Sequence, residues 1–478
     1  MILFMKYRII TFGCQTNQSD SERIAAILNK IGFEPALSQD DADFIIANAC
    51  SVRQSAIDRI HGIAHKIQKK KKRGEKTPIA VLTGCVLEQD RKKLAGKFDI
   101  ILDIRDIKNL PYILKTIRGT SNVLRKIQGR ATMNNINRWK TAEKSTEYFK
   151  ITPSYKSPFS AFVPIMTGCN NFCTYCAVPY TRGKEISRPV KDVINEIKNL
   201  IKKGYKEITL LGQNVNSYKY KIPKSKILIS KQIQKYKFKI PKNDYIDFAT
   251  LLFLINAIPG DFWIRFHSSH PKDFTDELID AITSCEKVTK YISLPVQAGN
   301  DKVLKRMNRP YTISQYKKLV NKIRKKIPDA SISTDFIVGF PGETKKQFQD
   351  SIKLFKNLKF DMAYIAQYSP RPGTAAERIF KDSVPIKEKK RRDRELTTVL
   401  KKTSLNINKK LVRTTQQVLI EKEIKRQNEH WLIGKTRGFK TVKIPITPDS
   451  SEKLIGNFAD VKITKALDLG LIGQTPLK

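Results

Sequence analysis

The sequence lacks any long apolar run. Its densest apolar stretch, Leu251 to Ile258, is far shorter than the ~18 to 20 residues that a membrane-spanning helix needs. The N-terminus, MILFMKYRIITFG, has its apolar residues before its first lysine and no small-residue cleavage site. We therefore expect a first strand there and not a signal peptide. The prediction is a cytoplasmic protein without membrane contact.

Acidic residues are scarce. The 478 residues include 45 Asp and Glu against 90 Lys and Arg, a formal net charge of +45. This excess favours nucleic acid as a partner, because each neutralised phosphate releases counterions. A lysine-rich genome is the alternative explanation for part of it. An apolar fraction of 40% still suffices for packed cores, and the length indicates about three domains.

Cysteine is also rare, with seven residues. An odd count with one tight cluster favours metal or redox chemistry over a disulfide framework. In residues 5–120, strand-like and helix-like segments alternate, which predicts an open α/β sheet domain. Cys14, Cys50 and Cys85 each follow a predicted strand, in ITFGC, IIANAC and VLTGC. Because parallel strands end at one edge of a sheet, we expect these cysteines to converge on a ligand site.

The rest of the chain predicts two more domains. Residues 121–154 are polar and indicate a linker, and residues 155–405 contain six predicted strands separated by helix-like stretches. This order favours an α/β incomplete (βα)6 TIM-like barrel with its chemistry at the carboxyl ends of the strands. Residues 219–242, with nine lysines and no acid, indicate a solvated insertion, with RNA binding as the alternative. Short alternating strands predict a small β-barrel at 408–478, either a nucleic-acid-binding module or a structural cap.

The most specific motif is GCNNFCTYC, in which Cys169, Cys173 and Cys176 follow a predicted strand with C-x3-C-x2-C spacing. Three thiolates on one loop can hold three irons of a four-iron cluster, and no further cysteine or histidine lies nearby for the fourth iron. An open coordination position indicates chemistry, as it does at catalytic zinc. A structural zinc site completed by His267 or His270 is the alternative.

With Tyr175 before the last cysteine, this motif resembles that of the radical S-adenosylmethionine (SAM) enzymes. The resemblance implies that SAM chelates the fourth iron and is cleaved to a 5′-deoxyadenosyl radical. The segments TFGCQTNQSDSE, NACSVRQSA and TGC resemble those of the methylthiotransferase family, and the terminal module resembles its TRAM domain. That family likeness implies a second, auxiliary 4Fe-4S cluster on Cys14, Cys50 and Cys85.

GCNNFCTYCAVPYTRGKEISRP and LLGQNVNSY resemble the MiaB-type tRNA methylthiotransferases. This implies a tRNA-2-methylthio-N6-isopentenyl(dimethylallyl)adenosine synthase, which methylthiolates carbon 2 of the adenosine beside the anticodon. The auxiliary cluster would carry the sulfur, and a second SAM the methyl group. Action on threonylcarbamoyl-adenosine or on a ribosomal protein aspartate stays open, as does a non-enzymatic iron-sulfur RNA-binding protein. We expect a monomer that binds the tRNA anticodon stem-loop and takes electrons from a donor such as flavodoxin or ferredoxin.

Candidate SAM contacts are fewer and less specific. Gly339 and Gly342 in VGFPGET permit close backbone approach to an adenine or ribose, although a turn that ends a strand is the alternative. Gln297, at another strand end, can bond a ligand through its amide. Asn300 can do the same or cap the next helix.

Several basic residues are candidates for binding SAM or tRNA phosphates. Arg182 and Arg188 could each bind the SAM carboxylate or a tRNA phosphate bidentately, and Arg188 joins the cofactor-binding set with Gln297, Gly339 and Gly342. No catalytic residue is assigned. In the terminal module, four cations around a Gly-rich turn are expected to hold the stem phosphates: Lys435, Arg437, Lys440 and Lys443.

Overall fold

The computed structural model describes residues 5–118, 144–221, 244–426, 429–446 and 454–475. The chain forms two compact units. The first contains Met1–Lys156, Met166–Arg188 and Ser369–Arg378, and the second contains Ser157–Ile165, Pro189–Tyr368 and Ile379–Lys478.

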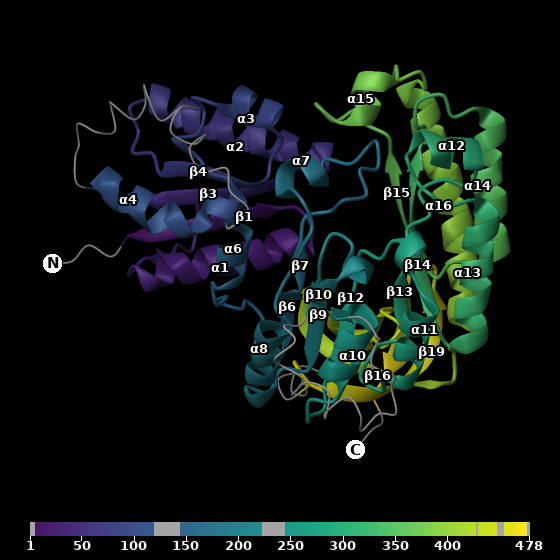
Figure 1. The fold of residues 1–478 in the computed structure, drawn as a ribbon. Helices are drawn as coiled ribbons and strands as arrows, with labels where there is room; N and C mark the ends of the chain where they lie inside the picture. Colours follow the sequence, from purple (N-terminus) through teal and green to yellow (C-terminus); the bar gives the residue numbers. More distant parts are fainter. Residues whose placement is uncertain (1–4, 119–143, 222–243, 427–428, 447–453, 476–478) are drawn as a thin grey trace. The chain divides into compact units, whose positions relative to one another are not determined.

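Unit 1 is built on a five-stranded sheet in the order β2-β1-β3-β4-β5, with every neighbouring pair parallel. Its strands are β1 (Lys6–Phe12), β2 (Glu34–Pro35), β3 (Phe44–Cys50), β4 (Ile79–Cys85) and β5 (Ile100–Ile101). Its helices are α1 (Gln15–Lys30), α2 (Gln54–Lys72), α3 (Glu88–Leu94), η1 (Ile104–Asn109), α4 (Leu110–Arg118) and α6 (Lys144–Phe149). Figure 1 shows α2 and α3 on one face of the sheet and α1, α4 and α6 on the other.

Each face of this sheet has its own core. On one face, Ile24 and Leu28 of α1 pack with Leu110 of α4, and on the other Ile60 of α2 packs with Leu94 of α3. Strand β3 is buried along its whole length, as expected for a central parallel strand covered on both sides. The predicted open α/β sheet is confirmed.

The described end of the predicted linker differs from expectation. Residues 119–143 lie outside the described residues, but α6 packs onto unit 1. Tyr148 and Phe149 are both buried, and the Tyr148 hydroxyl donates a 2.6 Å hydrogen bond to Asp20. The polar composition of the segment concealed this aromatic pair.

Unit 2 contains the six predicted strands in chain order, as two parallel three-stranded sheets. They are β6 (Ser160–Pro164), β9 (Glu207–Leu211), β12 (Trp263–Phe266), β13 (Tyr291–Ser293), β14 (Ser331–Val338) and β15 (Met362–Gln367). The main helices between them are α8 (Val190–Lys202), α10 (Phe248–Asn256), α11 (Asp276–Ser284), α12 (Asp301–Arg306), α13 (Ile313–Lys326) and α14 (Lys345–Leu358). A parallel bridge between Ile264 and Val288 links the two sheets, so the six βα units run as the sequence predicts.

The Lys-rich insertion begins and ends in a short hairpin. Strand β10 (Lys219–Lys221) pairs with β11 (Tyr245–Asp247) in antiparallel register. Residues 222–243, which hold most of the predicted insertion, lie outside the described residues.

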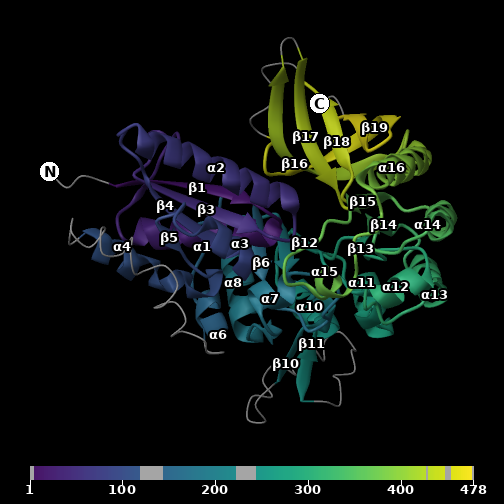
Figure 2. The same ribbon diagram turned by 90° about the horizontal axis from the view of Figure 1, so that it is seen from above.

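The C-terminal module is a closed five-stranded barrel, as predicted. It follows α16 (Ile386–Lys409) and has the strand order β16-β17-β18-β20-β19. The strands are β16 (Thr415–Arg426), β17 (Glu429–Thr436), β18 (Thr441–Pro445), β19 (Phe458–Leu467) and β20 (Gly470–Gln474). Val418, Leu432, Ile444 and Ile463 contribute to its core. Figure 2 shows this barrel beside α16.

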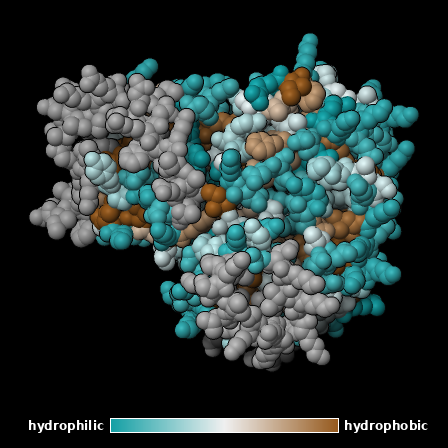
Figure 3. Space-filling view, viewed as in Figure 1, coloured by the Kyte–Doolittle hydropathy of each residue, from teal (hydrophilic) through white to brown (hydrophobic). Residues whose placement is uncertain are grey.

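The described surface is largely hydrophilic on the face drawn in Figure 3, where apolar residues appear as scattered patches. Within the described segments, no helix combines the length and apolarity required to cross a membrane.

Candidate metal centres

Three cysteines gather at one edge of the unit 1 sheet. Strands β1, β3 and β4 are neighbours, and Cys50 and Cys85 stand directly opposite each other in the register. Cys14 follows β1 and is the N-cap residue of α1. All seven cysteines of the chain lie in described segments, and none forms a disulfide. The structure thus brings together the three residues that the strand pattern indicated.

Asn17 lies beside two cysteines of this group, Cys14 and Cys85. Its fully buried amide nitrogen donates to the Asn48 side chain at 3.0 Å and lies 4.0 Å from the Cys85 sulfur, while its oxygen lies 3.5 Å from the Cys14 sulfur. A hydrogen bond from Cys85 lowers the pKa of Cys50, so Cys50 is the more readily ionised of the pair. Sequence reasoning missed Asn17, although it lies within the segment TFGCQTNQSDSE.

Cys169, Cys173 and Cys176 lie on a loop between β7 (Met166–Thr167) and α7 (Val178–Arg182). Strand β7 pairs with β8 (Ile186–Ser187), which closes the loop at its base. Cys169 and Cys173 are buried, and burial raises the pKa of Cys169. The Asn171 amide donates to the Cys169 sulfur at 3.5 Å, and the Val178 N–H donates to the Cys176 sulfur at the same distance. Donors aimed at sulfur are the environment that a metal-bound thiolate requires.

A single zinc ion fits these cysteines poorly. Across the parts of the chain that the structure describes, no three His, Cys, Asp or Glu side chains are arranged to hold one metal ion. The two histidines of the zinc alternative are largely buried, and burial lowers the pKa of His267 to about 4 and of His270 to about 2. His267 packs edge-on against Tyr291 and Phe439, which also contact each other. A four-iron cluster spans wider sulfur positions and suits a set of three thiolates.

Arg182, a candidate for SAM or phosphate binding, already has buried partners inside unit 1. Its side chain is 4% exposed and forms a 2.5 Å ion pair with Asp20. Its Nε donates to the Cys85 sulfur at 2.9 Å. The expectation that Arg182 is available to a ligand is wrong.

The predicted SAM contacts are placed as follows. In unit 1, Arg188 is buried with its guanidinium 5.8 Å from the centre of the Phe149 ring. In unit 2, Gln297 has a φ of 72° and bonds through its backbone to β14. The Asn300 side chain accepts from the Lys302 N–H and so caps α12.

Both glycines of the SAM set have internal partners. The Gly339 N–H donates to Glu343 at 2.7 Å, and a Cβ added there would meet the Lys389 side chain at 2.4 Å. The Gly342 N–H donates to Ser383 at 2.9 Å. The close approach that Gly339 permits is therefore used at least in part by Lys389.

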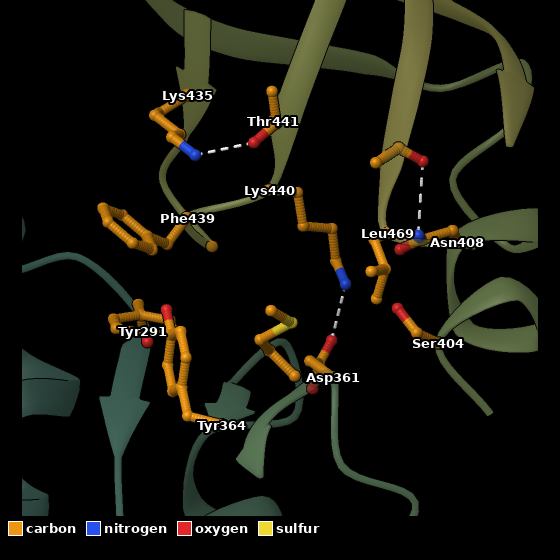
Figure 4. A pocket seen from close by; sticks show the side chains of 13 residues that line it. Tyr291, Asp361, Tyr364, Ser404, Asn408, Lys435, Phe439, Lys440, Thr441 and Leu469 are labelled. Atoms are coloured by element: carbon orange, nitrogen blue, oxygen red, sulfur yellow. Dashed lines mark hydrogen bonds and ion pairs between the residues drawn. The ribbon is translucent and has the colours of Figure 1, made fainter. Parts of the chain in front are cut away.

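Three of the four cations around the turn of the terminal module bind partners inside unit 2. Lys440 forms a 2.7 Å ion pair with Asp361, and Lys435 donates to Thr441 at 2.6 Å (Figure 4). Arg437 donates to the carbonyls of Glu286 and Val288. These three residues already have partners inside unit 2, and their contact with RNA phosphates stays a prediction. Lys443 alone of the four is exposed.

Comparison with known families agrees with these features. A cysteine loop of this spacing followed by parallel βα units defines the class of radical SAM enzymes, and the "Radical SAM superfamily" model matches residues 163–355. The models "Uncharacterized protein family UPF0004" and "TRAM domain" match residues 6–103 and 409–474.

Two relatives carry the name tRNA-2-methylthio-N(6)-dimethylallyladenosine synthase. The protein of Syntrophomonas wolfei is 38% identical, covering 98% of this chain and 97% of its own. That of Clostridium botulinum (strain Langeland) is 39% identical, covering 98% and 96%. The chain belongs to the MiaB-type methylthiotransferase family of radical SAM enzymes, which transfer sulfur-containing groups. Family membership brings an iron-sulfur cluster and SAM as cofactors.

Among solved structures, a more distant likeness is to the radical SAM methyltransferase TsrM of Kitasatospora setae with cobalamin and a 4Fe-4S cluster bound. Its TM-score is 0.48 at 12% identity, covering 78% of this chain and 77% of that one.

Proposed function

We propose that this enzyme methylthiolates carbon 2 of N6-isopentenyl(dimethylallyl)adenosine beside the tRNA anticodon. The observation that carries the proposal is the presence of two cysteine triplets in unit 1, one at the sheet edge and one on the loop after β7, in a chain collinear with the named synthases. A single radical SAM cluster needs one triplet, so the second supports a separate role in sulfur transfer.

Each triplet would hold one 4Fe-4S cluster. Cys169, Cys173 and Cys176 would leave one iron open for SAM, and the bound cofactors together supply the radical chemistry. The triplet Cys14, Cys50 and Cys85 would hold the auxiliary cluster, with the amide nitrogen of Asn17 as a donor beside the Cys85 sulfur. Gln297, Gly339, Gly342 and Arg188 remain the proposed SAM contacts, and the proposed domains are 5–120, 155–405 and 408–478.

Iron content tests the two-cluster proposal. Anaerobically reconstituted protein should contain about eight irons, and about four after either triplet is changed to alanine. Loss of the loop triplet should abolish SAM cleavage, whereas loss of the sheet-edge triplet should leave SAM cleavage and abolish methylthiolation. Cys285→Ala is the matched control, because this buried thiol ends α11 and burial raises its pKa to about 12. One zinc and no iron would contradict the proposal.

Substrate identity requires a separate measurement. Mass spectrometry of tRNA nucleosides from a deletion strain should show the loss of methylthio-isopentenyl-adenosine. Loss of the methylthio form of threonylcarbamoyl-adenosine, or of a modified ribosomal aspartate, would transfer the proposal to one of those substrates.

For the RNA surface, the register of the terminal barrel places Lys422, Lys443 and Lys465 in one row. Lys422 and Lys443 both pair with Ile433, and Lys443 and Lys465 both pair with Ile472. All three lysines are exposed. Because neighbouring strands are about 4.8 Å apart, alternate strands place these charges about 10 Å apart in a line, where they can neutralise phosphates of one RNA backbone.

Salt dependence tests this row. Changing its three lysines to glutamine should weaken tRNA binding and reduce the slope of log K against log salt by about 2 to 3, near 0.9 for each phosphate that is no longer neutralised. SAM cleavage without tRNA should be unchanged. The control changes three exposed lysines of α12 and α13: Lys302, Lys318 and Lys325. Equal slopes in the two triple variants would place the phosphate-binding residues elsewhere.

We also propose a cytoplasmic monomer that is reduced by a flavodoxin or ferredoxin. The nucleic-acid substrate, the family and the cysteines without disulfides support this setting.

A further inference from the structure

One buried cation connects the two cysteine triplets of unit 1. Arg182 ends α7, six residues after Cys176, so it belongs to the segment that carries the radical SAM loop. Its guanidinium nevertheless lies in the N-terminal sheet domain, 2.9 Å from the Cys85 sulfur and 2.5 Å from Asp20.

The anion beside it is itself fixed. Asp20, in α1, is fully buried and accepts a 2.6 Å hydrogen bond from the Tyr148 hydroxyl. Because an arginine guanidinium keeps its charge in proteins, Arg182 and Asp20 form a buried ion pair. A planar guanidinium can donate to a sulfur and a carboxylate at once, which an ammonium on a flexible stem cannot do with the same geometry.

We propose that Arg182 is a positioning residue for both metal centres: it anchors the Cys169–Cys176 loop to the sheet through Asp20 and donates a hydrogen bond to the sulfur of Cys85. The first part depends only on the protein contacts. The second part rests on the proposed auxiliary cluster.

The two parts predict different effects. An anchor made of a buried ion pair is strongly destabilised when one partner is removed, so the anchored segment should open more often. A donor and positive charge beside a cluster sulfur stabilise the more negative, reduced cluster. Loss of Arg182 should therefore make the reduction potential of the auxiliary cluster more negative.

The anchor is tested in apoprotein by hydrogen exchange. In Arg182→Gln, amides of residues 166–188 should exchange roughly a hundredfold faster, and Arg182→Lys should lie between this variant and the wild type. If Arg182→Gln fails to fold, the double variant Asp20→Asn/Arg182→Gln leaves no unpaired buried charge and should show the same loosened loop. The matched control is Arg91→Gln, which removes a 3.0 Å ion pair to Asp103 in the same unit.

The hydrogen bond to sulfur is tested with the Cys169→Ala/Cys173→Ala/Cys176→Ala protein, which keeps only the auxiliary site. Redox titration followed by electron paramagnetic resonance should give a more negative potential for Arg182→Gln than for Arg182 or for the Arg91→Gln control. If the triple variant holds no cluster, the proposed auxiliary cluster fails, whereas the exchange experiment still decides the anchor.

The two measurements decide the two roles separately. Unchanged exchange in residues 166–188 overturns the anchor. An unchanged potential in a protein that retains its auxiliary cluster overturns the hydrogen-bond role. Both changes together, absent from Arg91→Gln, support the dual role.

Discussion

Arg265 is expected to attach the terminal barrel to the βα strands of unit 2. It lies in β12 with a fully buried side chain that pairs with Glu207. Its other two nitrogens donate to the Arg437 carbonyl at 2.9 Å and to the Thr436 carbonyl at 2.8 Å, both in the turn after β17. Arg265→Met would leave Glu207 buried with the Ser160 hydroxyl, at 2.9 Å, as a donor.

The magnitude follows from these contacts. Removing one partner of a buried ion pair costs about 3 to 5 kcal/mol. The carbonyls of Thr436 and Arg437 also lose one donor each, although Thr436 keeps the Phe439 N–H. Such a loss is comparable to the whole stability of a small domain, so the terminal barrel should detach or unfold. Lys322→Met is the control, because its ion pair with Asp276 is about half exposed and should contribute less than about 1 kcal/mol.

Limited proteolysis suits this test, since a chain of several domains does not unfold in two states. Cleavage between α16 and β16 should accelerate about a hundredfold or more in Arg265→Met and barely change in Lys322→Met. Glu207→Gln/Arg265→Met should recover part of the loss, because it removes the unpaired carboxylate. Equal cleavage rates in the arginine variant and the control would show that the barrel is held by apolar contacts such as Trp263 on Phe458.

Three further predictions concern glycines and a histidine. In Gly84→Ala, with a φ of +105° and a Cβ 2.3 Å from the Ala49 carbonyl, the sheet-edge iron should be lost and SAM cleavage retained. In Gly168→Ala, the added Cβ would lie 2.0 Å from the Lys184 carbonyl. Iron assays should then show loss of the iron on the Cys169–Cys176 loop, together with SAM cleavage, while the sheet-edge iron is retained. Burial lowers the pKa of His267 from 6.5 to about 4, so below pH 6.5 only the unfolded chain takes up this proton and stability falls until about pH 4. His267→Phe should remove about 2 kcal/mol of that decline, measured between pH 7 and pH 4.5 as the opening free energy of β12 amides by native-state hydrogen exchange; an unchanged decline would contradict the assignment.

The strands could be predicted because their signals are local. Strands β1, β3, β4 and β5 of unit 1 and each βα strand of unit 2 are short apolar runs, and the shared edge of a parallel sheet then brings Cys14, Cys50 and Cys85 together. Strand β2 was missed, because its two residues, Glu34 and Pro35, are exposed and form no apolar run. The contacts of Arg182 could not be predicted in this way, because its partners are 97 and 162 residues away. Tyr148 was hidden for the same reason, since its partner Asp20 lies 128 residues earlier.

The two compact units of the structure do not follow the domain boundaries expected from the sequence. The loop that carries Cys169, Cys173 and Cys176 lies between β6 and α8 along the chain, yet it packs in unit 1 with the N-terminal sheet. A barrel fragment cut at the sequence boundary near residue 155 would keep these cysteines but lack Asp20 and Cys85. Arg182 would then lose both anions, and a cation that is buried in the full chain would have to move into water. An isolated barrel fragment is therefore expected to lose the contacts that hold the radical SAM loop in the full chain.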